Sequence, residues 1–139
     1  MLTARLIHPA LLGALAAAGH GSQILLADGN YPVSTGSSSA AERVYLNLRP
    51  GLVSVRQALE AVLTAVPVEA AHVMSPDQGD EPPIFCTFRE LLPDIHLTAL
   101  TRNEFYASAR RPDLAVVVAT GEQALYANLL LTIGVVPTD

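Results

Sequence analysis

Charged residues are scarce in this sequence of 139 residues, and lysine is absent. Only 15% of the residues are charged, whereas about 25% is typical of soluble domains. So few charges cover the surface of a monomer poorly, and we therefore expect apolar surface to be buried between the subunits of a homo-oligomer. The eight basic residues are all arginines and the formal net charge is -5, which argues against a nucleic-acid partner because phosphate binding needs a basic surface.

Cysteine occurs once, as Cys86, so no internal disulfide can form and a reducing compartment is indicated. The apolar residues around this cysteine predict a buried thiol that fills space in the core. No apolar run approaches the ~18 residues of a membrane span. The alanine-rich start resembles a secretory signal, but His8-Pro9 interrupts its apolar segment. We therefore expect a cytoplasmic protein with no membrane partner.

The common metal and nucleotide motifs are also missing. The four histidines form no H-x-x-H pair, and neither a P-loop nor a dinucleotide-binding fingerprint is present. A serine hydrolase would need G-x-S-x-G, which does not occur. We therefore predict no metal site, and general acid–base chemistry remains as the candidate activity.

Short apolar strands alternate with amphipathic helices along the chain, which is typical of an α/β fold. We predict a single three-layer domain over residues 1–139, with a largely parallel central sheet flanked by helices. The segment 125–136 is apolar enough to be either a strand or a helix. The other expected strands are 24–28, 44–48, 70–74, 95–100 and 114–119, and the expected helices are 9–18, 54–66, 84–91 and 102–110.

One histidine has almost no cover from its neighbours, because Gly19 and Gly21 flank His20. Gly19 also suits the C-terminal cap of the preceding helix. A short apolar strand separates His20 from Asp28, and we interpret the two as one side of a catalytic pocket in which histidine exchanges a proton with a sugar hydroxyl. Asp28 then orients the histidine or binds a polyol. Alternatively, Asp28 makes a simple turn and His20 lies at a helix C-terminus.

Two further groups of polar residues lie where α/β folds place their ligands. The segment 120–128 follows a buried strand, and Tyr126 and Asn128 share one face if the backbone is extended. On the helix 102–110, a guanidinium from Arg102 lies about one turn from the ring of Tyr106, as in many sugar sites. Each pattern also has a purely structural explanation: a polar turn for the segment 120–128, and a capped helix with core aromatic residues for 102–110.

Taken in order, the motifs resemble those of the L-fucose mutarotase / D-ribose pyranase family, formerly grouped with sugar transport proteins. The resemblance implies a compact α/β subunit in a ring-like homo-oligomer, a homo-octamer or homo-decamer, with active sites between neighbouring subunits. It also implies cofactor-free interconversion of the cyclic forms of a monosaccharide. The motifs are His8-Pro9-x-Leu11-Leu12, Gly19-His20-Gly21, Asp28-x-x-Tyr31-Pro32 and Thr120-Gly121-Glu122-x-x-x-Tyr126-x-Asn128.

The resemblance also implies roles for individual residues. His20 is the proton-transfer residue, Asp28 its partner or a substrate ligand, and Tyr126 a second acid/base or a ligand of the anomeric oxygen. The substrate-binding residues are Arg102, Asn128, Tyr106 and Tyr31.

Several positions bear on which sugar is used. Arg102-x-x-Phe105-Tyr106 and Tyr31-Pro32 resemble the fucose type, whereas residues 45–52 are closer to the ribose type. Ser22 stands where the family usually has an acid, and Gly29 where alanine is common. We expect an L-fucose-like substrate rather than a D-ribose-like one, and a non-catalytic sugar-binding or transport-accessory protein is the alternative.

Overall fold

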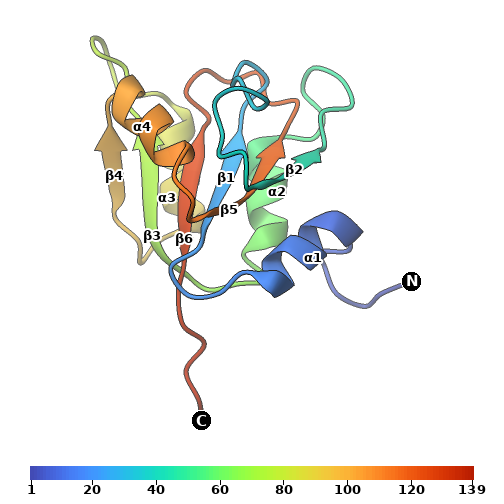
Figure 1. Ribbon diagram of the computed structural model, residues 1–139. Helices are drawn as coiled ribbons and strands as arrows, with labels where there is room; N and C mark the ends of the chain where they lie inside the picture. Colours follow the sequence, from blue (N-terminus) through green and yellow to red (C-terminus); the bar gives the residue numbers. More distant parts are fainter.

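A six-stranded sheet forms the centre of the molecule in a computed structural model that describes residues 1–139 (Figure 1). The strand order across the sheet is β2-β5-β1-β6-β3-β4. The strands are β1 (Gln23–Ala27), β2 (Glu42–Tyr45), β3 (Val68–Met74), β4 (Leu97–Leu100), β5 (Leu114–Ala119) and β6 (Leu129–Ile133). The helices are α1 (Pro9–Ala17), α2 (Val55–Val62), α3 (Ile84–Leu91) and α4 (Arg102–Ala109).

The sheet is mixed, because one central strand opposes the others. The pairs β2–β5, β5–β1 and β3–β4 are parallel, whereas β6 is antiparallel to both β1 and β3. If β6 were parallel to β5, the connection between them would need about a dozen residues or more, but the connecting segment 120–128 is shorter. The chain instead passes over the end of β1 and comes back as a strand. The apolar segment 125–136 therefore contains a strand, and the largely parallel sheet that we predicted has an antiparallel strand at its middle.

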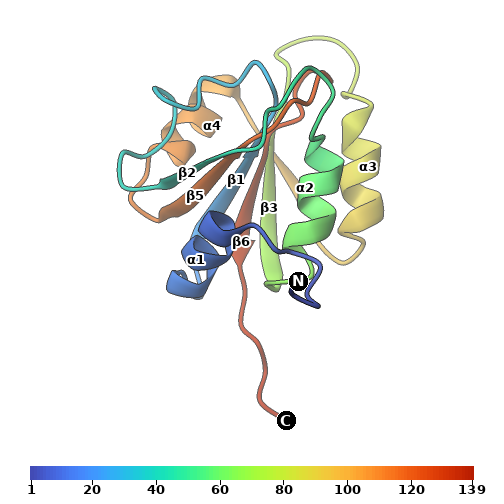
Figure 2. The same cartoon turned by 90° about the vertical axis from the view of Figure 1, so that its right-hand side faces the viewer.

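The helices cover both faces of the sheet and complete three layers, as predicted. One buried cluster joins α1, α2 and α3 to one face, and a second joins α4 and the loop after β1 to the other. Figure 2 shows α4 on one side of the sheet, with α2 and α3 on the opposite side. None of the helices combines the length and apolar composition needed to cross a membrane.

Most element boundaries agree with the sequence to within a few residues, and the exceptions have local causes. β2 ends at Tyr45 rather than residue 48, because the following segment folds into a turn against Gly121. α2 begins at a capping box formed by Ser54 and Gln57 but stops at Val62, before tighter turns lead into β3. The prediction for Cys86 was wrong: α3 buries its two phenylalanines, and the thiol between them is exposed.

Candidate active site

Six of the seven residues that the sequence singled out as site residues line one cavity of about 260 Å³. The cavity lies at the ends of β1 and β3, beside the start of α4. Ends of strands are where α/β sheets place their ligands. The six residues are Asp28, Tyr31, Arg102, Tyr106, Tyr126 and Asn128.

A reciprocal pair of hydrogen bonds holds the polar side of the cavity together. The side-chain amide of Asn128 donates to Asp28 Oδ2 at 3.0 Å, and the backbone N–H of Asp28 donates to Asn128 Oδ1 at 2.9 Å. The other carboxylate oxygen accepts from the backbone N–H of Asn30 at 2.9 Å. Burial raises the pKa of the Asp28 carboxyl above its ordinary 3.8, although these hydrogen bonds oppose the shift. The carboxylate is thus fixed in place and more basic than an exposed one.

Tyr126 reaches the cavity by an unusual backbone conformation. Its φ is 61°, the only positive value outside glycine, and such a conformation costs a non-glycine residue about 1–3 kcal/mol. Tyr126 and Asn128 therefore meet at one cavity without the extended backbone that we assumed. The Tyr126 hydroxyl lies 3.5 Å from Arg102 Nη2. The guanidinium of Arg102, which donates hydrogen bonds, and the hydroxyl of Tyr126, which can donate and accept them, therefore face the same cavity.

Aromatic rings form the apolar side of the cavity. Tyr31 packs edge-on against Tyr106, with ring centroids 5.4 Å apart. Its hydroxyl donates to the carbonyl of Gly36 at 2.7 Å, and burial raises the pKa of Tyr31, so its ring is the part available to a ligand. The guanidinium over the Tyr106 ring belongs to Arg110, at 5.7 Å, and not to Arg102 as the sequence suggested.

His20 lies at the other end of β1, away from this cavity. The five residues of β1 alone extend over roughly 16 Å, so within one chain Asp28 does not orient His20, contrary to our first interpretation. The helix before it ends at Ala17 with Ala18 extended, so Gly19 is not a left-handed cap; Gly21 has the positive φ, 85°. The turn is tied to β6, because the Gly21 N–H donates to the carbonyl of Ile133 at 3.0 Å.

A carboxylate that the sequence did not reveal binds His20 in place of Asp28. Nε2 of His20 lies 3.0 and 3.1 Å from the two carboxylate oxygens of Glu69, at the start of β3. Glu69 belongs to no motif, and it meets His20 only because β6 brings the starts of β1 and β3 to the same edge. No three His, Cys, Asp or Glu side chains gather as metal ligands would.

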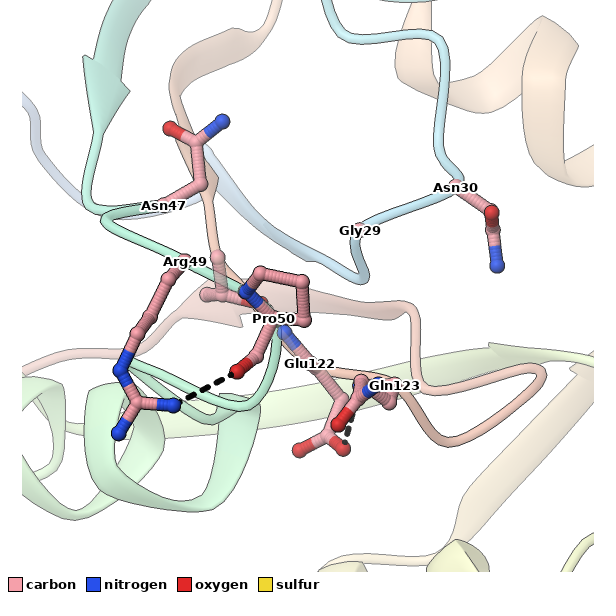
Figure 3. A pocket seen from close by; sticks show the side chains of 9 residues that line it. Gly29, Asn30, Asn47, Arg49, Pro50, Glu122 and Gln123 are labelled. Carbon is pink, nitrogen blue, oxygen red and sulfur yellow. Dashed lines mark hydrogen bonds between the residues drawn. The ribbon is translucent and has the colours of Figure 1, made fainter.

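A second, wider pocket of about 400 Å³ lies beside the first and has only polar, glycine and proline residues in its lining. Figure 3 shows the loop with Asn30 on one side and the segment with Glu122 and Gln123 on the other. The Glu122 carboxylate accepts from backbone N–H groups of Val55, Gln123 and Ala124. It therefore holds the start of α2 and the 120–128 segment in place, and Asn30 is shared between the two pockets.

The chain is similar to known proteins over nearly its whole length. The model of the RbsD / FucU transport protein family matches residues 1–136. The chain belongs to this family. A fucose mutarotase of Mus musculus is 36% identical over 145 residues, covering 94% of this chain and 90% of the relative. A D-ribose pyranase of Paracidovorax citrulli is 35% identical over 130 residues, covering 94% and 95%.

The fold agrees with the family as well. The crystal structure of the fucose mutarotase in complex with L-fucose from Streptococcus pneumoniae superposes with a TM-score of 0.85 at 30% identity. The match covers 99% of this chain and 100% of that one. The family resemblance that we drew from the sequence motifs is confirmed.

Proposed function

We propose that this protein is a sugar mutarotase, an isomerase that interconverts the cyclic forms of a monosaccharide. The convergence of an aspartate, an asparagine, a tyrosine hydroxyl and an arginine on one small cavity carries this proposal. The cavity volume of about 260 Å³ lies below the range of about 300–1,000 Å³ that is usual for drug-sized ligands. This small volume is in keeping with a ligand as small as a monosaccharide. Relatives named fucose mutarotase and D-ribose pyranase support the reaction class.

The chemistry needs two proton transfers and no electron transfer. To open the hemiacetal, one group removes the proton of the anomeric hydroxyl while another protonates the ring oxygen; after rotation of the carbonyl end, the reverse steps close the ring. In our proposal the Tyr126 hydroxyl contacts the anomeric oxygen, and Asp28 and Asn128 bind hydroxyl groups. The guanidinium of Arg102 adds a fixed set of donors.

The proton-transfer residue, His20, comes from a second copy of the chain in this proposal, because β1 separates it from the cavity of its own copy. Its side chain is 58% exposed although Nε2 contacts Glu69, so the ring is accessible to a neighbouring copy. Exposed apolar residues lie near both ends: Leu125 lines the cavity, and Val135 and Val136 follow β6 on the side of His20. Head-to-tail contacts between such unlike surfaces generate a ring when the rotation between copies closes, and the sequence motifs imply such a ring, a homo-octamer or homo-decamer.

We further propose an L-fucose-like substrate. This sugar is a 6-deoxyhexose, whose methyl group needs an apolar contact that D-ribose does not. Met74 and the rings of Tyr31 and Tyr106 provide an apolar side to the cavity. Arg102 supplies hydrogen-bond donors to the same cavity.

A sugar-binding protein without turnover is the second candidate, and Ser22 is the observation that favours it. The Ser22 hydroxyl accepts from the backbone N–H of Gly19 at 3.3 Å, so it supports the turn and gives no negative charge to His20. Such a protein would bind sugar in the same cavity but leave the rate of anomeric exchange unchanged.

Exchange NMR at the anomeric proton separates these candidates. We expect wild-type protein to accelerate exchange of L-fucose more than that of D-ribose, and His20→Ala to abolish the acceleration while the oligomer stays intact. Sugar binding without acceleration would favour the non-catalytic candidate. Absence of both binding and acceleration across common aldoses would refute the proposed function.

A further inference from the structure

Tyr126 lies in a segment that has no backbone-to-backbone hydrogen bonds of its own. No N–H of residues 123–128 donates to a backbone carbonyl, and no carbonyl of these residues accepts from a backbone N–H. The left-handed backbone of Tyr126, with a φ of 61°, persists only where the surroundings fix it. Its hydroxyl makes a single hydrogen bond, at 3.5 Å from Arg102. The place of the hydroxyl therefore depends on what holds the two ends of the segment.

Two side chains hold those ends. At the end next to β6, the side chain of Asn128 is fixed by its buried pair of hydrogen bonds. At the other end, Glu122 Oε1 accepts from the N–H groups of Gln123 and Ala124, both at 3.0 Å. Tyr126 lies between these two anchors, so the Glu122 carboxylate shapes the turn that carries it.

The backbone of Glu122 is itself fixed from two sides. Its N–H donates to Thr120 Oγ1 at 3.2 Å, and its carbonyl accepts from the N–H of Gly29 at 2.9 Å. A Cβ added to Gly29 would lie 3.1 Å from that carbonyl oxygen, so the turn after Asp28 packs directly on Glu122. One residue thus ties the turn that carries Asp28 to the segment that carries Tyr126.

The Glu122 carboxylate makes hydrogen bonds only to backbone N–H groups. It forms no ion pair, and its second oxygen, Oε2, accepts from the N–H of Val55 at 3.2 Å. An ionised carboxylate has two accepting oxygens and no donor, which suits three N–H groups that arrive from two directions. Such charge-assisted hydrogen bonds are about twice as strong as neutral ones, so this side chain can hold a turn that has no other support.

We infer that Glu122 is the positioning residue of Tyr126; this inference rests on the proposed function. The carboxylate holds residues 123–126 so that the Tyr126 hydroxyl meets the anomeric oxygen of the bound sugar. Glu122 lines the second pocket and not the sugar cavity, so it acts through Tyr126 alone. The rate of ring opening then depends on Glu122 more than sugar affinity does, because the other polar residues of the cavity still bind the sugar.

Kinetics of two Glu122 variants test this inference. Glu122→Ala removes the acceptor for all three N–H groups and should lower kcat about tenfold, since a misplacement of about 1 Å can cost about 10²-fold. KM should stay within about threefold, because the backbone carbonyl that holds Gly29 remains. Glu122→Gln should recover part of kcat, since its amide oxygen can still accept hydrogen bonds from N–H groups.

Ser54→Ala is the matched control. It removes the cap of the Gln57 N–H, at 3.1 Å, and so loosens the same start of α2 without touching residues 123–126. Its kcat should equal that of the wild type. An unchanged kcat in Glu122→Ala, or the same loss in Glu122→Ala and Ser54→Ala, would overturn the inference.

A measurement without turnover separates this inference from the proposed function. The chain has four tyrosines, so ¹³C labelling of the tyrosine rings gives a simple spectrum. The Tyr126 signal should move in Glu122→Ala and stay in Ser54→Ala. Tyr31 and Tyr106, whose ring centroids lie 5.4 Å apart, report that the rest of the cavity is folded. An unmoved Tyr126 signal in Glu122→Ala refutes the inference, whether or not the wild-type protein accelerates exchange.

Glu122→Gln replaces Glu122→Ala in both measurements if the alanine variant does not fold. The decrease in kcat and the movement of the Tyr126 signal should then be smaller but in the same direction. A wild-type kcat together with an unmoved Tyr126 signal in Glu122→Gln would overturn the inference in that case.

Discussion

Replacing Asn128 with alanine tests whether the buried pair with Asp28 holds the site and the sheet together. The substitution removes the donor to Asp28 Oδ2 and the acceptor for the Asp28 backbone N–H, both within 3.0 Å. Asp28 and Asn128 are 5% and 4% exposed, and a buried polar group left without its partner costs about 1–3 kcal/mol. Because the adjoining cavity admits water to one of the two groups, only the other is left without a partner, and we expect a loss of about 1–3 kcal/mol in the free energy of unfolding.

Urea unfolding at neutral pH and fixed protein concentration measures this loss. Asn47→Ala is the control, since Asn47 is an exposed asparagine at the second pocket and its removal should change stability by less than about 0.5 kcal/mol. Equal midpoints and slopes for the two variants would show that the Asp28–Asn128 pair contributes nothing, and the reasoning about the buried site would be wrong.

Three other substitutions give distinct outcomes. Gly121→Ala should cost about 1–3 kcal/mol by urea unfolding, since its Cβ would lie 2.5 Å from the carbonyl oxygen of Leu52; Gly13→Ala, with open space around it, should not destabilise. Burial raises the pKa of the Asp28 carboxyl above its ordinary 3.8, so the folded state binds the carboxyl proton more tightly than the unfolded state does. As pH increases above 3.8, the free energy of unfolding of the wild type should therefore fall relative to that of Asp28→Asn, which does not titrate. Arg102→Ala should raise KM about tenfold while the unfolding midpoint is unchanged.

Local patterns in the sequence predicted most of the fold, because each element is marked by its own residues. Pro9 at the first turn of α1, the apolar run of β5 and the Thr101–Glu104 capping box of α4 all act within a few residues. Periodicity says nothing about the direction of a strand, so the apolar pattern alone did not predict that β6 runs antiparallel to its neighbours. It follows from the length of the 120–128 segment and from the place of β1 between β5 and β6.

The site was predictable only where its residues follow strand ends or begin a helix. Asp28 and Asn128 adjoin β1 and β6, and Arg102 begins α4, so the topology gathers them. The separation of His20 from Asp28 was implicit in the sequence, since a strand between two residues places them at opposite edges of a sheet. Glu69 carries no local signal at all. Its contact depends on β3 pairing with β6, which is a long-range property of the fold.

Mixed assemblies test the central claim most directly: that His20 of one copy works on a sugar held in the cavity of another. His20→Ala and Asp28→Asn should each be inactive alone. Co-expressed in equal amounts, they should restore anomeric exchange to about a quarter of the wild-type rate, because a quarter of randomly formed interfaces join an intact histidine to an intact cavity. No recovery in assemblies shown to contain both variants would contradict a site shared between copies.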